Sequence, residues 1–424
     1  MTTFPVLPTT AAPAAPPSAS APHVGEPRGT RVPGPTRRGW PARCAGLRHR
    51  ISASDREVLW LYLLTRVGVW TTAYGARWLF PADSRAHNAG SVLAPFQRWD
   101  WGHFLHVARD GYFPGSAGPT TDGWDNREAF FPGFPLLLRA VHGVVPSWAA
   151  AGLLVSLVAG AVAVLALARV ADSYLPHPDA GRRAVLFLLL SPCAVFLSVG
   201  YSEALFLAFA LPAWLAARRG RWPLAAALAA LATTVRISGL FLAAAIAVQF
   251  ALAARARGWW RPLPWLALPA LPAALYAWYL YAHTGDWMAW QHAQERGWYR
   301  TFHPPWEAWG NTWHAAFSGA HPTGYAFMFR AELVAMVVGV VLLGWLLARR
   351  HWPEASYLAL NLWALGTSYW YMSLPRATLL WWPLWVTLAA WSLRSRRFTT
   401  AYLCLVGPLS TVFALTFLTG RWAG

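Results

Sequence analysis

The chain has 424 residues, of which 56% are hydrophobic and only 12% are charged. Soluble domains are about 25% charged, so this composition excludes an ordinary soluble enzyme and indicates a membrane protein. The net charge is +18, but the arginines fall in short runs between apolar segments and not on one soluble face, which argues against a nucleic-acid partner. The three cysteines are far apart and offer neither metal-ligand spacing nor a disulfide framework.

Residues 1–50 are rich in Pro, Ala and Arg and have no apolar periodicity, which predicts a disordered tail. The tail lacks the apolar core of a signal peptide. Its arginines predict a cytoplasmic N-terminus under the positive-inside rule. We expect residues 51–424 to form a single membrane domain.

Eleven apolar segments follow, most of them near the roughly 20 residues that cross a bilayer. They lie at about 57–80, 148–171, 184–200, 202–217, 222–236, 238–256, 262–283, 326–348, 355–372, 376–393 and 399–420. A further stretch, 130–144, is interrupted by Pro132 and Pro135, so we expect a short interfacial or re-entrant helix there. The sequence therefore predicts an all-α polytopic membrane protein with about eleven transmembrane helices.

Threading these segments from a cytoplasmic N-terminus places most arginines in the inner loops, in agreement with the positive-inside rule. Two long segments, 81–147 and 284–325, then lie outside the cell membrane. No fixed-period repeat and no inverted repeat of the kind found in many transporters is evident.

Asp100 lies between Trp99 and Trp101, directly after the first apolar segment. A carboxylate so close to a bilayer needs water, a partner or a function. If residues 99–110 form a helix, it can lie in the interface plane with its aromatic rings at headgroup level. Asp100 is then either a general base at the outer surface or a surface acid paired with Arg98 or Arg109, and the pattern favours neither.

Glu203 follows Tyr201 and Ser202 at a predicted outer turn between two spans. Its carboxylate could position a substrate hydroxyl. The pattern alone favours a structural interpretation, in which Ser202 caps a helix and Glu203 complements the positive helix N-terminus.

Arg236 and Arg376 lie at predicted outer ends of spans, against the general distribution of arginines in this chain. Each could snorkel to the membrane surface, or could hold a phosphate. Sites that break a sequence rule are often functional, so both are candidate site residues.

The tryptophans and histidines do not by themselves distinguish a functional role from a structural one. Interface belts and helix packing explain most of the 29 tryptophans, and the sequence does not separate a sugar-stacking role of a few, such as Trp99, Trp101 or Trp298, from this structural role. His103 and His106 share a helical face, but no acid or cysteine completes a metal set beside them. We therefore predict no metal site.

Six short motifs resemble, in the same order, those of the PIG-V family, which contains the second GPI mannosyltransferase and its bacterial relatives. They are Trp99-Asp100 with His103-Phe104-Leu105 and Gly111-Tyr112; Ala129-Phe130-Phe131-Pro132-Gly133-Phe134-Pro135-Leu136; Tyr201-Ser202-Glu203-Ala204-Leu205-Phe206; Arg236 with Gly239; Thr284-Gly285-Asp286 with Gln291 or Gln294 and Trp298; and Ser373-Leu374-Pro375-Arg376 with Pro383-Leu384. The resemblance extends over about residues 57–420. Phe134 replaces the commoner Tyr, and residues 1–50 have no counterpart in the family pattern.

This resemblance implies a GT-C-like glycosyltransferase, a polytopic enzyme with an acid in its first outer loop as the base. Asp100 is then the catalytic base. The resemblance implies these substrate-binding residues: Trp99, His103, Glu203, Arg236, Asp286, Gln291 and Arg376. The donor is expected to be a polyprenyl-phosphate sugar, with mannose as the sugar, used at the extracytoplasmic face.

The expected reaction is an inverting transfer to an acceptor hydroxyl on a glycolipid, glycan or protein. Arg236 or Arg376 would stabilise the departing phosphate, and no cofactor is required, although a divalent metal is left open. The alternative is a transporter or flippase for a lipid-linked sugar. The polar candidates gather at one predicted face instead of along a path through the membrane, which favours the enzyme.

Overall fold

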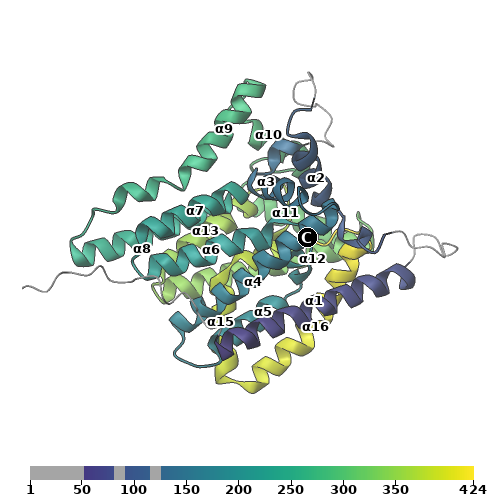
Figure 1. Ribbon diagram of the computed structural model, residues 1–424. Coiled ribbons are helices and arrows are strands. Elements are labelled where there is room, and N and C mark those ends of the chain that lie inside the picture. The colour runs from purple at the N-terminus through teal and green to yellow at the C-terminus, as the bar shows by residue number, and fades with distance from the viewer. Residues whose placement is uncertain (1–51, 81–90, 115–125) are drawn as a thin grey trace, which may run out of the picture. The chain divides into compact units, whose positions relative to one another are not determined.

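The computed structural model describes residues 52–80, 91–114 and 126–424 (Figure 1). Within these ranges every regular element is helical, which confirms the predicted all-α class. The predicted tail, 1–50, lies outside the described residues, as do parts of the first predicted outer segment. The division of the chain at residue 50 stays a prediction.

Eight helices of the described part coincide with predicted spans, and α15 (Trp382–Arg394) covers only the second part of another. The eight are α1 (Ala53–Leu79), α4 (Trp148–Tyr174), α6 (Ser202–Arg218), α7 (Trp222–Val235), α8 (Ser238–Arg257), α12 (Thr323–Ala348), α13 (Trp352–Gly366) and α16 (Arg396–Leu418).

Five helical segments in the described ranges are long and apolar enough to cross a membrane: α4, α8, the segment Leu263–Thr284, α12 and α16. The chain is therefore a multi-pass membrane protein. The count of eleven spans stays a prediction, because α7 has 14 residues, α13 has 15 and α15 has 13.

Three predicted spans are interrupted. Segment 184–200 is not one helix, since α5 (Ala180–Leu189) ends before Pro192 and a short 3-10 helix, η3 (Ala194–Leu197), follows. Segment 262–283 is divided into η4 (Leu263–Ala267) and α9 (Ala270–Thr284), and segment 376–393 starts with α14 (Leu374–Ala377) and η5 (Thr378–Leu380) before α15. Proline lacks the N–H that continues a helix and clashes with the preceding turn, which accounts for the first two breaks.

The long helices pack closely around a buried aromatic core. Helix α4 lies against α5 and α6, α6 against α7, and α8 against α13, while α1 and α16 run side by side (Figure 1). The Trp382 ring lies 4.9 Å from that of Trp214 and 4.2 Å from that of Tyr357, and all three side chains are fully buried. This rigid bundle carries the shorter elements.

Three short helices, α2 (Asp100–Asp110), α3 (Gly133–His142) and α10 (Ala289–Trp298), gather at one end of the bundle (Figure 1). Helix α2 contacts α3, and α10 contacts η2 (Arg127–Ala129). Pro132 is the N-cap of α3, so the proline-interrupted stretch forms the short helix that the sequence predicts. An ideal Cβ at Gly133 would lie only 2.6 Å from Thr234 Oγ1, so α3 contacts the end of α7 through a glycine.

Candidate active site at the start of helix α2

Helix α2 begins at Asp100 because the preceding Trp99 adopts a left-handed φ of 52°. Positive φ is uncommon outside glycine and needs support from the surroundings. Trp99 supplies part of this support, since its Nε1 donates to the carbonyl oxygen of Arg421 at 3.0 Å. Half of the Trp99 side chain (48%) remains exposed beside the site.

Trp101 anchors the same helix in the bundle. Its buried ring packs against Gly152 of α4 and Gly200 of the turn before α6, where an ideal Cβ would lie 2.5 Å from the indole in each case. Any larger residue at these positions must displace the ring. The position of Asp100 is therefore fixed from both sides.

Arg376 joins two carboxylates. Its NH1 donates to Asp100 Oδ2 at 2.6 Å, and its Nε donates to Glu203 Oε1 at 2.5 Å. The guanidinium carbon lies 4.8 Å from the ring centroids of both Phe196 and Tyr201, a cation–π arrangement. Asp100 therefore pairs with neither Arg98 nor Arg109, and Arg109 binds Asp110 at 2.8 Å.

Arg236 extends this network. Its NH1 donates to Glu203 Oε1 at 2.6 Å and to Ser202 Oγ at 2.7 Å. Ser202 thus accepts from Arg236 and provides no N-cap, so the capping role that the sequence pattern favours is wrong. An ideal Cβ at Gly239 would lie 2.4 Å from Thr233 N, which explains why glycine follows three residues after Arg236 at this tight turn between α7 and α8.

Glu332, on α12, holds the turn that precedes Arg376. Its Oε1 and Oε2 accept from the backbone N–H groups of Ser373 (2.7 Å) and Leu374 (2.8 Å), at the start of α14. Ser373 has a left-handed φ of 70°, and these bonds hold that turn. The sequence analysis missed Glu332, although an acid inside a predicted span is a signal of function.

Arg300 is the second residue that the sequence analysis missed as a site residue. Gln291 Nε2 donates to its carbonyl oxygen at 3.1 Å, and the Arg300 Nε is buried without a hydrogen-bond partner. Burial, with the nearby positive charge of Arg236, lowers the pKa of Arg300 to about 10, so the side chain stays protonated at neutral pH. Glu332, Arg376 and Asp100 also act on this pKa, so the guanidinium lies close to the network.

The environment of Asp100 keeps it ionised. Burial alone raises the pKa of its carboxyl, but the charge of Arg376 and its hydrogen bond outweigh this effect and hold the pKa below its usual value. His103, on the next turn of α2, and Arg236 contribute in the same direction. Asp100 is thus a carboxylate at neutral pH.

Other predicted site residues lie around this network. The His103 ring stacks on Phe130 at 4.8 Å and lies 5.7 Å from Trp298. Asp286 has a local role instead, since it accepts from Met288 N and pairs with His292 at 2.7 Å. The hydrogen bonds of Asp286 stay within residues 284–292, so this carboxylate is not part of the network around Asp100.

Asp100 and Glu203 form ion pairs with Arg236 and Arg376, and both oxygens of Glu332 accept from backbone N–H groups. Among the described residues Arg300 has no ion pair and its Nε has no hydrogen-bond partner, which suits an anionic group. No three His, Cys, Asp or Glu side chains of the described ranges lie close enough to hold a metal. Metal independence itself stays a prediction.

Part of this site lies in a segment that is similar to known proteins. A family model described as mannosyltransferase (PIG-V) matches residues 83–255, which include Asp100, Glu203 and Arg236 but not Arg376. The chain is 33% identical over 256 residues to GPI alpha-1,6-mannosyltransferase 2 of Cricetulus griseus, covering 52% of this chain and 49% of that protein.

The mouse and human proteins of the same name are 32% and 33% identical over 211 and 187 residues, which cover 46% and 41% of this chain. These stretches are 40% and 34% of the respective relatives, so the chain spans half or less of the length of the relatives it matches. The match and the identities confirm the resemblance that the motifs indicate. Residues 83–255 thus resemble the PIG-V mannosyltransferase family.

Proposed function

We propose that the chain is an integral-membrane mannosyltransferase that moves a sugar from a polyprenyl-phosphate donor to an acceptor hydroxyl. The observation that carries this proposal is the ionised Asp100 at the start of α2. Arg376 binds its carboxylate, and Asp100 itself lies in the segment that matches the family model. The names of the relatives support mannose as the sugar.

Asp100 would act as the base. In an inverting transfer the acceptor oxygen attacks the anomeric carbon on the side opposite the phosphate, and a carboxylate receives the acceptor proton. The hydroxyl becomes strongly acidic as its oxygen bonds to carbon. A carboxylate of low pKa therefore suffices, provided that it is ionised and correctly placed, and Arg376 favours both conditions.

Arg236 and Arg300 would bind the donor phosphate. The leaving phosphate is a stable anion, so it needs cations more than a proton donor. Arg376 already donates to two carboxylates, which favours a positioning role for it instead of the phosphate contact that the sequence analysis allowed. Arg300 has an unused buried N–H and Arg236 is about one quarter exposed.

The reaction would take place at the extracytoplasmic face. The charge distribution supports an outer position for α2 and α10, and a lipid-linked donor would present its sugar there while its chain stays in the bilayer. The acceptor would be a glycolipid, glycan or protein hydroxyl, bound near Trp99 and His103.

Replacing Asp100 by Asn tests the proposal, because the amide keeps the shape of the side chain but cannot take the proton. We expect transfer of radiolabelled mannose from polyprenyl-phosphate mannose, measured in membranes that contain the chain, to fall by at least about 100-fold. Asp110→Asn is the matched control, since Asp110 is an exposed acid on the same helix that binds Arg109. Equal transfer by Asp100→Asn and wild type at equal expression would refute the assignment of Asp100 as the base.

A further inference from the structure

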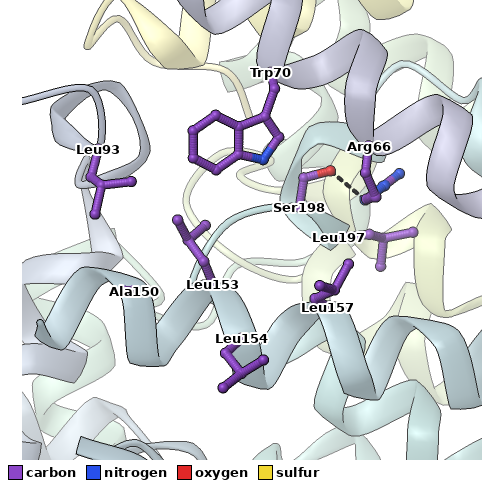
Figure 2. Close-up of a pocket in the computed structure, with 9 residues that line it drawn as sticks. All are labelled: Arg66, Trp70, Leu93, Ala150, Leu153, Leu154, Leu157, Leu197 and Ser198. Carbon is purple, nitrogen blue, oxygen red and sulfur yellow. Dashed lines mark hydrogen bonds between the residues drawn. The ribbon is translucent and has the colours of Figure 1, made fainter. Parts of the chain in front are cut away.

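A cavity of about 290 Å³ lies between α1, α4 and the turn after η3 (Figure 2). It shares no residue with the carboxylate–arginine network. Its wall is apolar except at one end, where Arg66 and Ser198 lie. The lining residues are Arg66, Trp70, Leu93, Ala150, Leu153, Leu154, Leu157, Leu197 and Ser198.

Arg66 is buried, with 6% of its surface exposed, near the middle of the predicted span 57–80. Its NH1 donates to Ser198 Oγ, as Figure 2 shows, and its guanidinium lies 4.9 Å from the Tyr62 ring centroid. The Arg66 Nε is buried and has no partner. Among the residues that the structure describes, no carboxylate forms an ion pair with Arg66.

A buried arginine in a membrane span is costly unless an anion or several hydrogen bonds compensate it. The described residues offer Arg66 two hydroxyls, those of Ser198 and Thr65, and an aromatic face, so its positive charge has no anionic partner among them. An anion that binds here must carry an apolar group, because the rest of the cavity wall consists of leucine, tryptophan and alanine side chains.

The cavity opens toward the bilayer. Trp70 on α1 and both Leu154 and Leu157 on α4 line it and are about 40% exposed (39%, 42% and 39%). Neighbouring α1 residues such as Leu64 and Val67 are exposed as well. A hydrocarbon chain can therefore enter sideways from the membrane without crossing the outer loops.

We propose that this cavity binds a membrane lipid with a phosphate group, its hydrocarbon chain along the leucines and its phosphate at Arg66. The shared chemistry fits a polyprenyl phosphate or a glycerophospholipid. The site adjoins the candidate active site, since Ser198 precedes Glu203 by five residues and the Gly152 turn of α4 contacts Trp101. Binding does not depend on the proposed sugar transfer.

Photo-crosslinking tests this site. The full chain is placed in phosphatidylcholine nanodiscs with a diazirine-tailed polyprenyl phosphate in one arm and a diazirine-tailed phosphatidylglycerol in the other. We expect at least one probe to label peptides of α1 or α4, with competition by the unlabelled phosphate lipid but not by the corresponding free alcohol. The arm that labels more strongly identifies the source of the lipid.

Two variants address the two halves of the site. Arg66→Gln removes the charge and should lower labelling about tenfold or more, and Leu153→Trp should block the chain. The matched controls are Arg56→Gln, an exposed arginine on α1, and Val158→Trp, an exposed residue on α4 outside the cavity. Should Arg66→Gln fail to fold, Arg66→Lys and Leu153→Trp carry the test.

The proposal fails if neither phosphate probe labels α1 or α4, or if the free alcohol competes as well as the phosphate. It fails equally if labelling persists at the wild-type level in Leu153→Trp. A protein that binds the probe but transfers no sugar would refute the proposed function and leave this site intact.

Discussion

Arg376 contacts two carboxylates at once, and this distinguishes it from the other two arginines near Asp100. Two carboxylates already neutralise the positive charge of this guanidinium. A phosphate therefore needs another arginine to bind it. Arg300 meets this need, because its Nε has no partner and Gln291 fixes its backbone. Gln291 thus acts on the site through Arg300.

Arg300→Gln should raise the apparent KM for the polyprenyl-phosphate donor about tenfold, while the KM for the acceptor changes little, because only the donor carries the phosphate that the lost cation would bind. Initial rates with purified protein over a range of donor concentrations measure this. Arg296→Gln is the control, since Arg296 on α10 bonds to Asn126. An unchanged donor KM would remove Arg300 from the phosphate site.

At the scale of single residues, the sequence identifies charged residues that the structure brings together but does not predict their contacts. Asp100, Glu203, Arg236 and Arg376 stand out because charges are rare in apolar sequence, and the structure brings all four together. Their pairing depends on four distant segments and has no local sequence signal. Arg300 lies in a polar loop, where one more arginine is unremarkable.

Helix α2 depends on two glycines that lie outside it. Gly152 and Gly200 belong to α4 and to the turn before α6, and together they make the space for Trp101. A substitution at either glycine should shift Asp100 although neither glycine contacts it, because the displaced Trp101 is the next residue in the chain.

Gly200→Ala should therefore lower kcat strongly, because a Cβ 2.5 Å from the indole must push Trp101 and the start of α2 away from Arg376. The measurement is the initial rate of mannose transfer, with thermal unfolding as the check on folding. Gly102→Ala is the control, because a Cβ at Gly102, inside α2, meets nothing within 4 Å. Wild-type kcat in Gly200→Ala would show that Trp101 does not position Asp100.

The sequence locates helices well where apolar runs are uninterrupted, as in α4 and α12. The prediction of one span over segment 184–200 is wrong. Its hydropathy is that of a single span, but Pro192 divides it into α5 and η3. Hydropathy reports burial in lipid or protein without distinguishing them, so buried turns inside the bundle resemble membrane spans.

The distribution of arginines predicts the orientation of the whole molecule in the membrane. The end of the bundle that carries α2, α3 and α10 is then predicted to lie outside. Single cysteines in a cysteine-free background test this orientation with a membrane-impermeant maleimide on intact cells. A cysteine at Met288, which is 54% exposed, should react from outside. A cysteine at His177, in the exposed turn between α4 and α5, should react only after permeabilisation. The reverse pattern would place the candidate site in the cytoplasm.

The separation between Asp100 and Arg376 has a consequence for biogenesis. The two partners lie 276 positions apart in the chain. At a synthesis rate of about 5–20 residues per second, Asp100 is made roughly 15–55 s before Arg376. During this interval the carboxylate lacks the cation that holds it in place. The geometry that the proposed reaction needs is therefore complete only after α14 has been made and has docked on α12.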